Sequence, residues 1–205
     1  MKIILSLIFL FLLNSSYLIS APFYWEYIDV KIDIQENGDM IITEKQKYKF
    51  LDSYTNKRYR YIPLDKIEKI KNVSVSEDNK KIPHQTGIEK NQFWIRWTHA
   101  LNPPESHTFK IEYRIIGGLQ KLGNNEMLYW KVIFADRVSE VRSAKILVTL
   151  PQSLSGKVIS FTSFGVASSE KSLGPNLYEF NSLETIAPKS ELEIQIVYPA
   201  GIIGN

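Results

Sequence analysis

The 205-residue chain contains no cysteine and few of the residue patterns that build catalytic or metal centres. Without cysteine it can form no disulfide framework, no thiol nucleophile and no thiolate metal site. Its histidines, His84, His99 and His107, are too far apart in sequence to match the short spacings of zinc-binding motifs. Gly-x-Ser-x-Gly and phosphate-binding glycine loops are also absent. The sequence therefore predicts no catalytic residue, no metal ligand and no bound cofactor.

The chain also lacks a strong excess of one charge, because 25 Lys and Arg stand against 22 Asp and Glu. The two signs are interspersed, which is typical of a solvated surface. The tract from Arg58 to Tyr61 alternates cations with aromatic rings, as surfaces that bind single-stranded nucleic acid do. The small net charge of +3, together with the export argued next, argues against nucleic acid as a partner.

A long apolar run occurs only at the amino terminus, where Ile3 to Leu13 is apolar except for Ser6. Lys2 precedes this run and Asn14-Ser15-Ser16 follows it, the layout of a secretory signal peptide. A retained anchor is the alternative, but a membrane span needs roughly 20 apolar residues. We expect residues 1–21 to be a signal peptide and residues 22–205 to be extracytoplasmic, either periplasmic or secreted. Membrane association stays open at this point.

Alternating apolar residues predict β-strands in the rest of the chain. Leu128, Trp130, Val132 and Phe134 share one parity, and the same pattern recurs from Ala144 to Leu150. Two such strands so close in sequence predict a sheet core with Trp130 at its centre. Asn-Gly at residues 37–38 predicts a hairpin with a tight turn in which both central residues have positive φ.

Further alternating segments make up about ten strands in total, and no segment shows a sustained helical period. These segments are 23–35, 40–50, 66–76, 93–97, 107–116, 157–161, 176–180 and 191–198. This spacing predicts an all-β fold, an antiparallel β-sandwich over residues 22–205. If the domain has two parts, we expect the boundary at residues 117–125. Arg58 to Pro63 is interpreted as the end of a polar loop.

Glu44 interrupts a strand face that is otherwise apolar. A buried carboxylate needs a partner, and Arg60 is our choice because a guanidinium can hold a carboxylate by two parallel bonds. Tyr59 and Tyr61 have the opposite parity, so we expect them to face outward as an aromatic contact surface. Tyr and Arg are typical interface anchors. The candidate residues for an interaction or a structural pair are therefore Glu44, Arg58, Tyr59, Arg60 and Tyr61.

The order of several short motifs resembles a known family. These motifs are Asn37-Gly38-Asp39, Ile42-Thr43-Glu44, Arg60-Tyr61-Ile62-Pro63, Phe109-Lys110-Ile111-Glu112-Tyr113, Leu128-Tyr129-Trp130 and Val148-Thr149-Leu150-Pro151. Together they resemble the amino-terminal domain of the predicted bacterial membrane proteins called domain-of-unknown-function family 2207. The resemblance implies an extracytoplasmic β-rich domain that membrane spans usually follow, and it implies no established activity. Here the sequence ends at Asn205, about where a span would begin, which suggests a soluble short form or a truncated chain.

These observations favour an exported, non-enzymatic β-sandwich that binds a partner at the bacterial cell envelope. The partner would be an envelope protein or a membrane component, with no nucleic acid and no small-molecule cofactor. The alternative is an envelope carbohydrate hydrolase with paired carboxylates, for which Asp136 and Glu140 are available. A concave pocket holding two carboxyls of raised pKa would favour the hydrolase. A flat surface with exposed Tyr and Arg would favour the binding module.

Overall fold

The computed structural model describes residues 21–204, and these residues form β-strands and one short 3-10 helix. The all-β prediction is therefore confirmed. The predicted signal peptide, apart from Ala21, lies outside the described residues. The strands are β1 (Phe23–Ile34), β2 (Met40–Phe50), β3 (Lys57–Pro63), β4 (Lys69–Glu77), β5 (Lys80–Lys81), β6 (His84–Glu89), β7 (Gln92–Thr98), β8 (Glu105–Ile116), β9 (Gln120–Leu122), β10 (Asn125–Ile133), β11 (Ala144–Thr149), β12 (Ser160–Gly165), β13 (Ser168–Gly174), β14 (Leu177–Ser182) and β15 (Leu192–Pro199). Among residues 21–204, no helix has the length and apolar character needed to cross a membrane.

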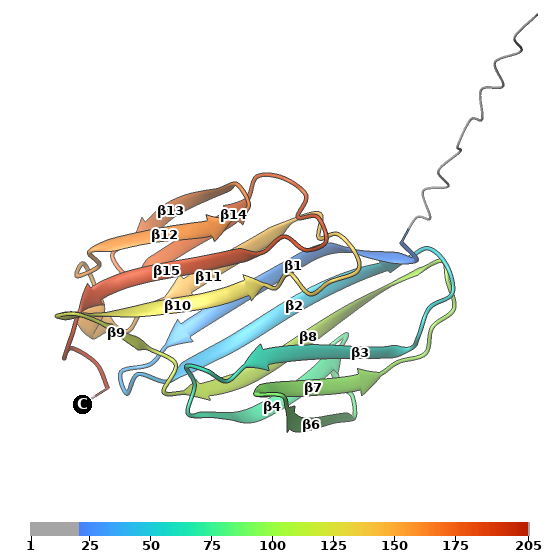
Figure 1. The fold of residues 1–205 in the computed structure, drawn as a ribbon, viewed down its shortest axis with the longest axis horizontal. Helices are drawn as coiled ribbons and strands as arrows, with labels where there is room; N and C mark the ends of the chain where they lie inside the picture. Colours follow the sequence, from blue (N-terminus) through green and yellow to red (C-terminus); the bar gives the residue numbers. More distant parts are fainter. Residues whose placement is uncertain (1–20, 205) are drawn as a thin grey trace, which may run out of the picture.

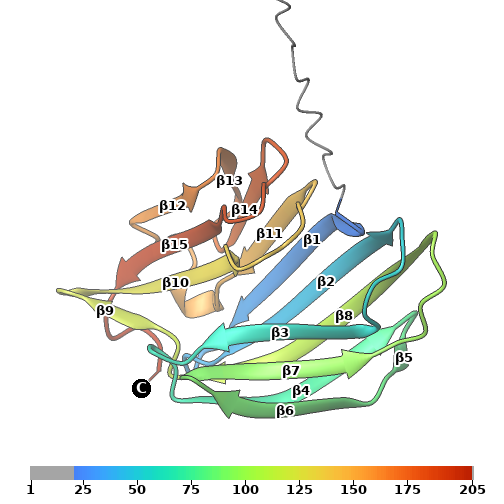
Figure 2. The ribbon, with the colours of Figure 1, turned by 45° about the vertical axis from the view of Figure 1, so that its right-hand side comes forward.

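The strands are arranged in two layers (Figure 1). One layer is an eight-stranded sheet in the order β13-β14-β11-β1-β2-β8-β4-β5. The other layer is divided into a four-stranded sheet, β12-β15-β10-β9, and a three-stranded sheet, β3-β7-β6. Figure 2 shows both smaller sheets over the same face of the large one. The core fills the space between the layers, as expected for a sandwich.

The large sheet contains one parallel pair, β1 with β11, in which Val30 aligns with Ile146. The other strand pairs of the described residues are antiparallel, so the predicted antiparallel sandwich holds with this single exception. A parallel neighbour needs a long connection between the two strands. Here that connection runs from residue 35 to residue 143, which is more than half of the described residues.

The two strands at the centre of the sequence argument, β10 and β11, do not belong to the same sheet. β10 pairs with β15 and β9 in one layer, whereas β11 pairs with β1 and β14 in the other. Residues 134–143, which join the two strands, thus carry the chain from one layer to the other, and alternation alone could not show this. Trp130 does face the core, with only 6% of its surface exposed, so its predicted burial is confirmed.

The structure has more strands than the sequence predicted. Residues 58–63, interpreted as the end of a loop, belong to strand β3. The predicted connection at residues 119–125 contains β9, and β6 and β13 were not anticipated. β6 and β13 are exposed or half-buried along their whole length, so they carry little of the apolar alternation on which prediction depends. A division near residues 117–125 stays a hypothesis, and the large sheet takes strands from both sides of it.

The predicted hairpin at Asn37-Gly38 joins β1 to β2, but its turn differs from the expectation. The Gln35 N–H donates to the Asp39 carbonyl at 2.8 Å, and the Gly38 N–H donates to the Gln35 carbonyl at 2.9 Å. Only Gly38, at φ 81°, has positive φ in this turn. The loop is therefore the three-residue type, in which one left-handed glycine follows an ordinary turn.

Replacement of Trp130 by alanine tests the core. We expect Trp130→Ala to lower the free energy of unfolding by roughly 3–5 kcal/mol, because a large buried side chain leaves a cavity. Ile41→Ala is the control, since Ile41 is 40% exposed and should cost less than about 1 kcal/mol. Chemical denaturation of both variants measures the effect. Equal losses in the two variants would contradict the assigned core.

Candidate functional site

The structure brings Glu44 of β2 and Arg60 of β3 together across the two layers. Both side chains are almost fully buried, at 1% and 2% exposure. The Arg60 Nε–H donates to both carboxylate oxygens of Glu44, with N–O distances of 2.8 and 3.0 Å. This geometry differs from the two parallel bonds that we expected, because Nη1 of Arg60 donates instead to the Tyr61 carbonyl.

The Glu44 carboxylate has two further donors. The Tyr113 hydroxyl donates to Oε1 at 2.5 Å, and the Gln46 side chain donates to Oε2 at 2.8 Å. Burial acts to lower the pKa of Arg60, but the Glu44 carboxylate outweighs burial and the pKa is raised. Burial, and then Glu44, raise the pKa of Tyr113 well above its usual value. The group is a buried hydrogen-bonded network, of which the sequence had indicated only the Glu44–Arg60 pair.

Arg58, also on β3, is 4% exposed but binds no carboxylate within the described chain. Its Nε donates to His99 Nε2 at 3.1 Å, and its two terminal nitrogens donate to the carbonyls of Lys57 at 2.7 Å and Thr55 at 2.5 Å. The guanidinium also lies 4.6 Å from the ring centre of Phe50. Burial lowers the pKa of Arg58. The protein therefore holds a cation here with dipoles and rings and without a counter-charge.

Arg58 and Arg60 also form hydrogen bonds with backbone carbonyls at the free edge of β3. Hydrogen bonds join Leu64 to Asn91 and His99 to Asn56 just beyond the two ends of the β3–β7 pair. Because hydrogen-bonded pairs alternate along an antiparallel ladder, the odd-numbered residues of β3 direct their backbone groups away from β7. Two of the outward carbonyls, those of Lys57 and Tyr61, accept bonds from Arg58 and Arg60. Side chains of β3 thus occupy much of an edge that could otherwise pair with another strand.

The opposite face of this sheet carries an aromatic cluster, which we call the outer aromatic face: Tyr59, Tyr61, Trp94 and Arg96. Tyr59 is 49% exposed, and its ring meets that of Tyr61 at 5.1 Å and 61°. The Arg96 guanidinium lies 4.2 Å from the ring centre of Trp94 and donates to the Tyr61 hydroxyl at 2.9 Å. Trp94 lies over Gly87 of β6, where an added Cβ would be only 2.3 Å from the ring. Tyr59 and Tyr61 face outward as predicted, and the alternation of β7 could have identified Trp94 and Arg96.

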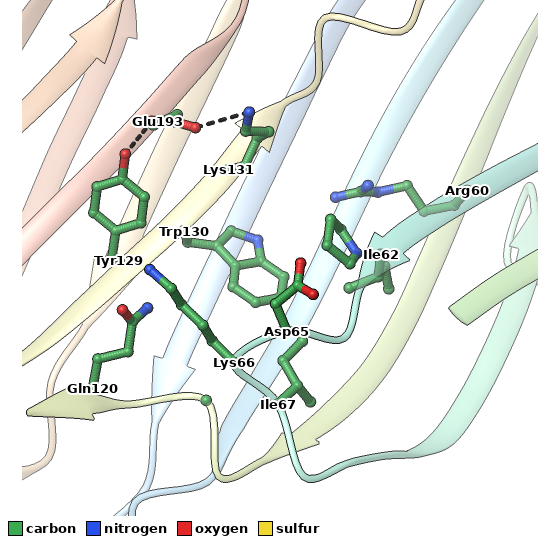
Figure 3. A pocket seen from close by; sticks show the side chains of 12 residues that line it. Arg60, Ile62, Asp65, Lys66, Ile67, Gln120, Tyr129, Trp130, Lys131 and Glu193 are labelled. Carbon is green, nitrogen blue, oxygen red and sulfur yellow. Dashed lines mark hydrogen bonds and ion pairs between the residues drawn. The ribbon is translucent and has the colours of Figure 1, made fainter. Parts of the chain in front are cut away.

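A cavity of about 270 Å³ lies between β3 and β10, where the two smaller sheets meet (Figure 3). Trp130 and Arg60 line it, together with Lys131 and Glu193. Glu193 accepts a hydrogen bond from the Tyr129 hydroxyl and is 3.0 Å from Lys131 Nζ. Burial acts to raise the pKa of Glu193, but these two donors outweigh burial and lower it.

The two carboxyl groups considered for a hydrolase are not gathered in one cavity, because Asp136 lines two cavities and Glu140 lines neither of them. Asp136 is exposed, and Glu140 instead pairs with Arg142 at 3.2 Å on the surface. Burial raises the pKa of the Asp29 carboxyl. Asp29 does not line any of the cavities found among residues 21–204.

The three histidines are only partly gathered. His99 and His107 have ring centres 4.3 Å apart, whereas His84 begins strand β6. Glu77 and Glu105 lie 2.5 and 2.9 Å from the two ring nitrogens of His107. Within residues 21–204, no group of three or more His, Asp or Glu side chains could hold a metal ion.

The fold and the buried network define an all-β sandwich domain, and its sequence places it in a family. A family model described as the N-terminal domain of a predicted membrane protein (DUF2207) matches residues 26–198. Because the match covers most of the chain, the protein belongs to this family. No curated protein sequence matches the chain significantly.

Solved structures share the fold at low sequence identity. A Legionella pneumophila protein described as a candidate nutrient binding protein has a TM-score of 0.57 at 9% identity, with 86% of this chain and 67% of that chain covered. Native yeast LTA4 hydrolase has a TM-score of 0.56 at 12% identity, with 85% and 29% covered. An M1 zinc metallopeptidase of Deinococcus radiodurans has 0.51 at 9%, with 84% and 42% covered. This chain therefore corresponds to less than half of either enzyme, and the likeness concerns the fold alone.

A double-mutant cycle tests the Glu44–Arg60 pair. Glu44→Gln and Arg60→Met should each lower the free energy of unfolding by roughly 3–5 kcal/mol, because each leaves a buried group unpaired. The double variant should lose clearly less than the sum of the two. The exposed pair Lys110–Glu112, with both side chains 40% exposed, provides the control, with an expected coupling below about 1 kcal/mol. Strictly additive losses for Glu44 and Arg60 would contradict the pairing.

The pH dependence of stability tests the His99 contact with Arg58. Burial, and then Arg58 and His107, lower the pKa of His99 to about 4. Since an unfolded histidine has a pKa near 6.5, the unfolded state binds more protons between these values, and stability falls as pH drops from about 6.5 to 4. His99→Gln should reduce this slope, because glutamine binds no proton in this pH range. Its amide oxygen can still accept the hydrogen bond from Arg58, so the contact itself is kept. Denaturation curves at pH 7 and pH 4.5 measure the slope, and an identical slope in the variant would exclude His99 as its source.

Proposed function

We propose that this domain is a non-catalytic binding module of the cell envelope that contacts a partner protein through the outer aromatic face. The observation that carries the proposal is the combination of Tyr59, Tyr61, Trp94 and Arg96 on one side of a regular sheet. Trp, Tyr and Arg are the residues that most often dominate the binding energy of protein interfaces. Here they are held in place before any partner arrives, by ring–ring and cation–ring contacts.

The interior of the sheet supports this role by limiting the motion of the outer residues. Arg60 and Arg58 alternate with Tyr59 and Tyr61 along β3. Buried hydrogen bonds fix Arg60, and partly buried ones fix Arg58. A side chain that is ordered before binding loses less conformational entropy when the complex forms. The outer aromatic face is therefore suited to contact a folded or extended partner without rearrangement.

The proposed location is outside the cytoplasm, reached through the amino-terminal signal peptide that the sequence predicts. The family description as a predicted membrane protein is consistent with a place at the membrane. Mass spectrometry of protein recovered from the envelope fraction would test cleavage between about Ser16 and Ala21. An intact Met1 in that fraction would overturn it.

Site-specific photocrosslinking in cells tests the proposed contact surface. A benzoyl-phenylalanine at position 59 should give a discrete protein adduct, and adding Trp94→Ala should reduce the yield of that adduct at least several-fold. The matched control places the same group at position 31, an exposed site on β1 of the large sheet. Equal adduct yields at positions 59 and 31, or no adduct at position 59, would contradict this assignment of the surface.

A further inference from the structure

A groove of about 750 Å³ crosses one end of the three-stranded sheet, beside the outer aromatic face. We call it the basic groove, and it is lined by Thr55, Lys57, Arg58, Tyr59, Pro83, His84, Gln85, Arg96, Trp97 and Thr98. Three of these residues are Lys or Arg, and none is Asp or Glu. The charged side chains that line the groove are all cationic, apart from the titratable His84. The protein as a whole carries nearly equal numbers of positive and negative side chains, so the charge of the groove differs from that of the chain as a whole.

Arg58 contributes a buried positive charge to the lining of the basic groove. Its guanidinium is buried against His99, two backbone carbonyls and the ring of Phe50, and no carboxylate among residues 21–204 binds it. A buried ion is normally paired, because leaving water is costly for an isolated charge. An anion bound in the groove above Arg58 would provide the counter-charge that the protein itself does not place there.

Arg96 supplies a fixed cation at the rim. The plane of its guanidinium is restrained by Trp94 and by the hydrogen bond to the Tyr61 hydroxyl. Its acidic neighbour, Glu89, lies 3.3 Å from Nη2, and the side chains of this pair are 43% and 55% exposed. Pairs that are so exposed are weak, so an incoming carboxylate can replace Glu89 at little cost. Lys57 adds an exposed charge on the neighbouring strand.

From these contacts we infer that the basic groove binds an acidic, extended peptide segment of the partner protein. This inference rests on the proposed function and specifies the chemistry of the partner. The volume is within the roughly 300–1,000 Å³ typical of ligand clefts. Planar carboxylates match guanidinium geometry, which favours Asp and Glu side chains as the groups recognised by Arg96.

The aromatic rings favour a peptide over a sugar polymer as the occupant. Sugar rings need an open aromatic face, but Trp94 lies over Gly87 and has Arg96 at 4.2 Å from its ring centre. Tyr61 likewise has Arg96 at 5.8 Å and the Tyr59 ring at 5.1 Å. The rings of Trp94 and Tyr61 therefore hold the Arg96 guanidinium in position, which leaves less of each ring face open to a sugar. Binding of an acidic sugar polymer is an alternative outcome of the experiment below.

Isothermal titration calorimetry with hexaglutamate, and with hexaglutamine as the matched neutral peptide, tests the inference on the purified protein. We expect hexaglutamate to bind with an affinity that falls as salt is added, and hexaglutamine to show no measurable binding. Arg96→Gln and Lys57→Gln should each weaken hexaglutamate binding, Arg96→Gln by at least about ten-fold. Lys31→Gln, an exposed site on the large sheet, should change it by less than about two-fold. Circular dichroism checks that each variant is folded.

Several results would overturn the inference. These are equal binding of the two peptides, no binding of hexaglutamate, or the same loss in Lys31→Gln as in Arg96→Gln. Oligogalacturonate is the acidic polysaccharide probe. If it binds as tightly as hexaglutamate and depends on the same residues, the inferred ligand is an acidic polysaccharide and the peptide inference is wrong. If hexaglutamate does not bind but the crosslinked adduct at position 59 still forms, the proposed contact through the outer aromatic face is kept. Only the inference that the partner segment is acidic is then wrong.

Discussion

The sandwich depends on one buried ion pair that spans its two layers. Glu44 belongs to the large sheet and Arg60 to the small one, so their contact fixes how the three-stranded sheet lies on the core. An unpaired carboxylate in this position would be strongly destabilising, which makes the pair a requirement of the fold once Glu44 is inside. Gln46, Tyr48 and Tyr113 extend the bonding, since the Tyr48 hydroxyl donates to Gln46 at 2.9 Å and Gln46 in turn donates to Glu44.

Arg137 is a third buried arginine, after Arg60 and Arg58, and its hydrogen-bond partners are carbonyl groups. Arg137 is 6% exposed and donates to the carbonyls of Phe134, Ser139, Ala187 and Ser190 at distances of 2.7–3.0 Å. Burial lowers its pKa to about 10, so the group is charged at neutral pH. Its bonds join the connection after β10 to the connection before β15. Like Arg58, this side chain satisfies backbone groups where the sheets end and no strand partner is available.

The two faces of β3 divide structural and recognition roles between neighbouring residues. Arginines at even positions hold the core and the strand edge, and tyrosines at odd positions lie on the outer surface. Side chains alternate between the two faces of a strand, so the hydrogen bonds that fix Arg58 and Arg60 also fix the backbone that carries Tyr59 and Tyr61. Binding then costs less conformational entropy at the two tyrosines. The outer aromatic face and the basic groove both begin at this strand, and a contact there would be supported directly by the Glu44 network.

The sequence by itself determined the all-β class, the burial of Trp130 and the pairing of Glu44 with Arg60. Each of these follows from a local rule, either the two-residue period of strands or the cost of an unpaired buried charge. The tertiary structure alone decided that β10 and β11 belong to different sheets, and that β1 and β11 run parallel. It also placed Trp94 and Arg96 beside Tyr59 and Tyr61. Such placements depend on which strands become neighbours, and alternation within one strand is the same whichever partner it has.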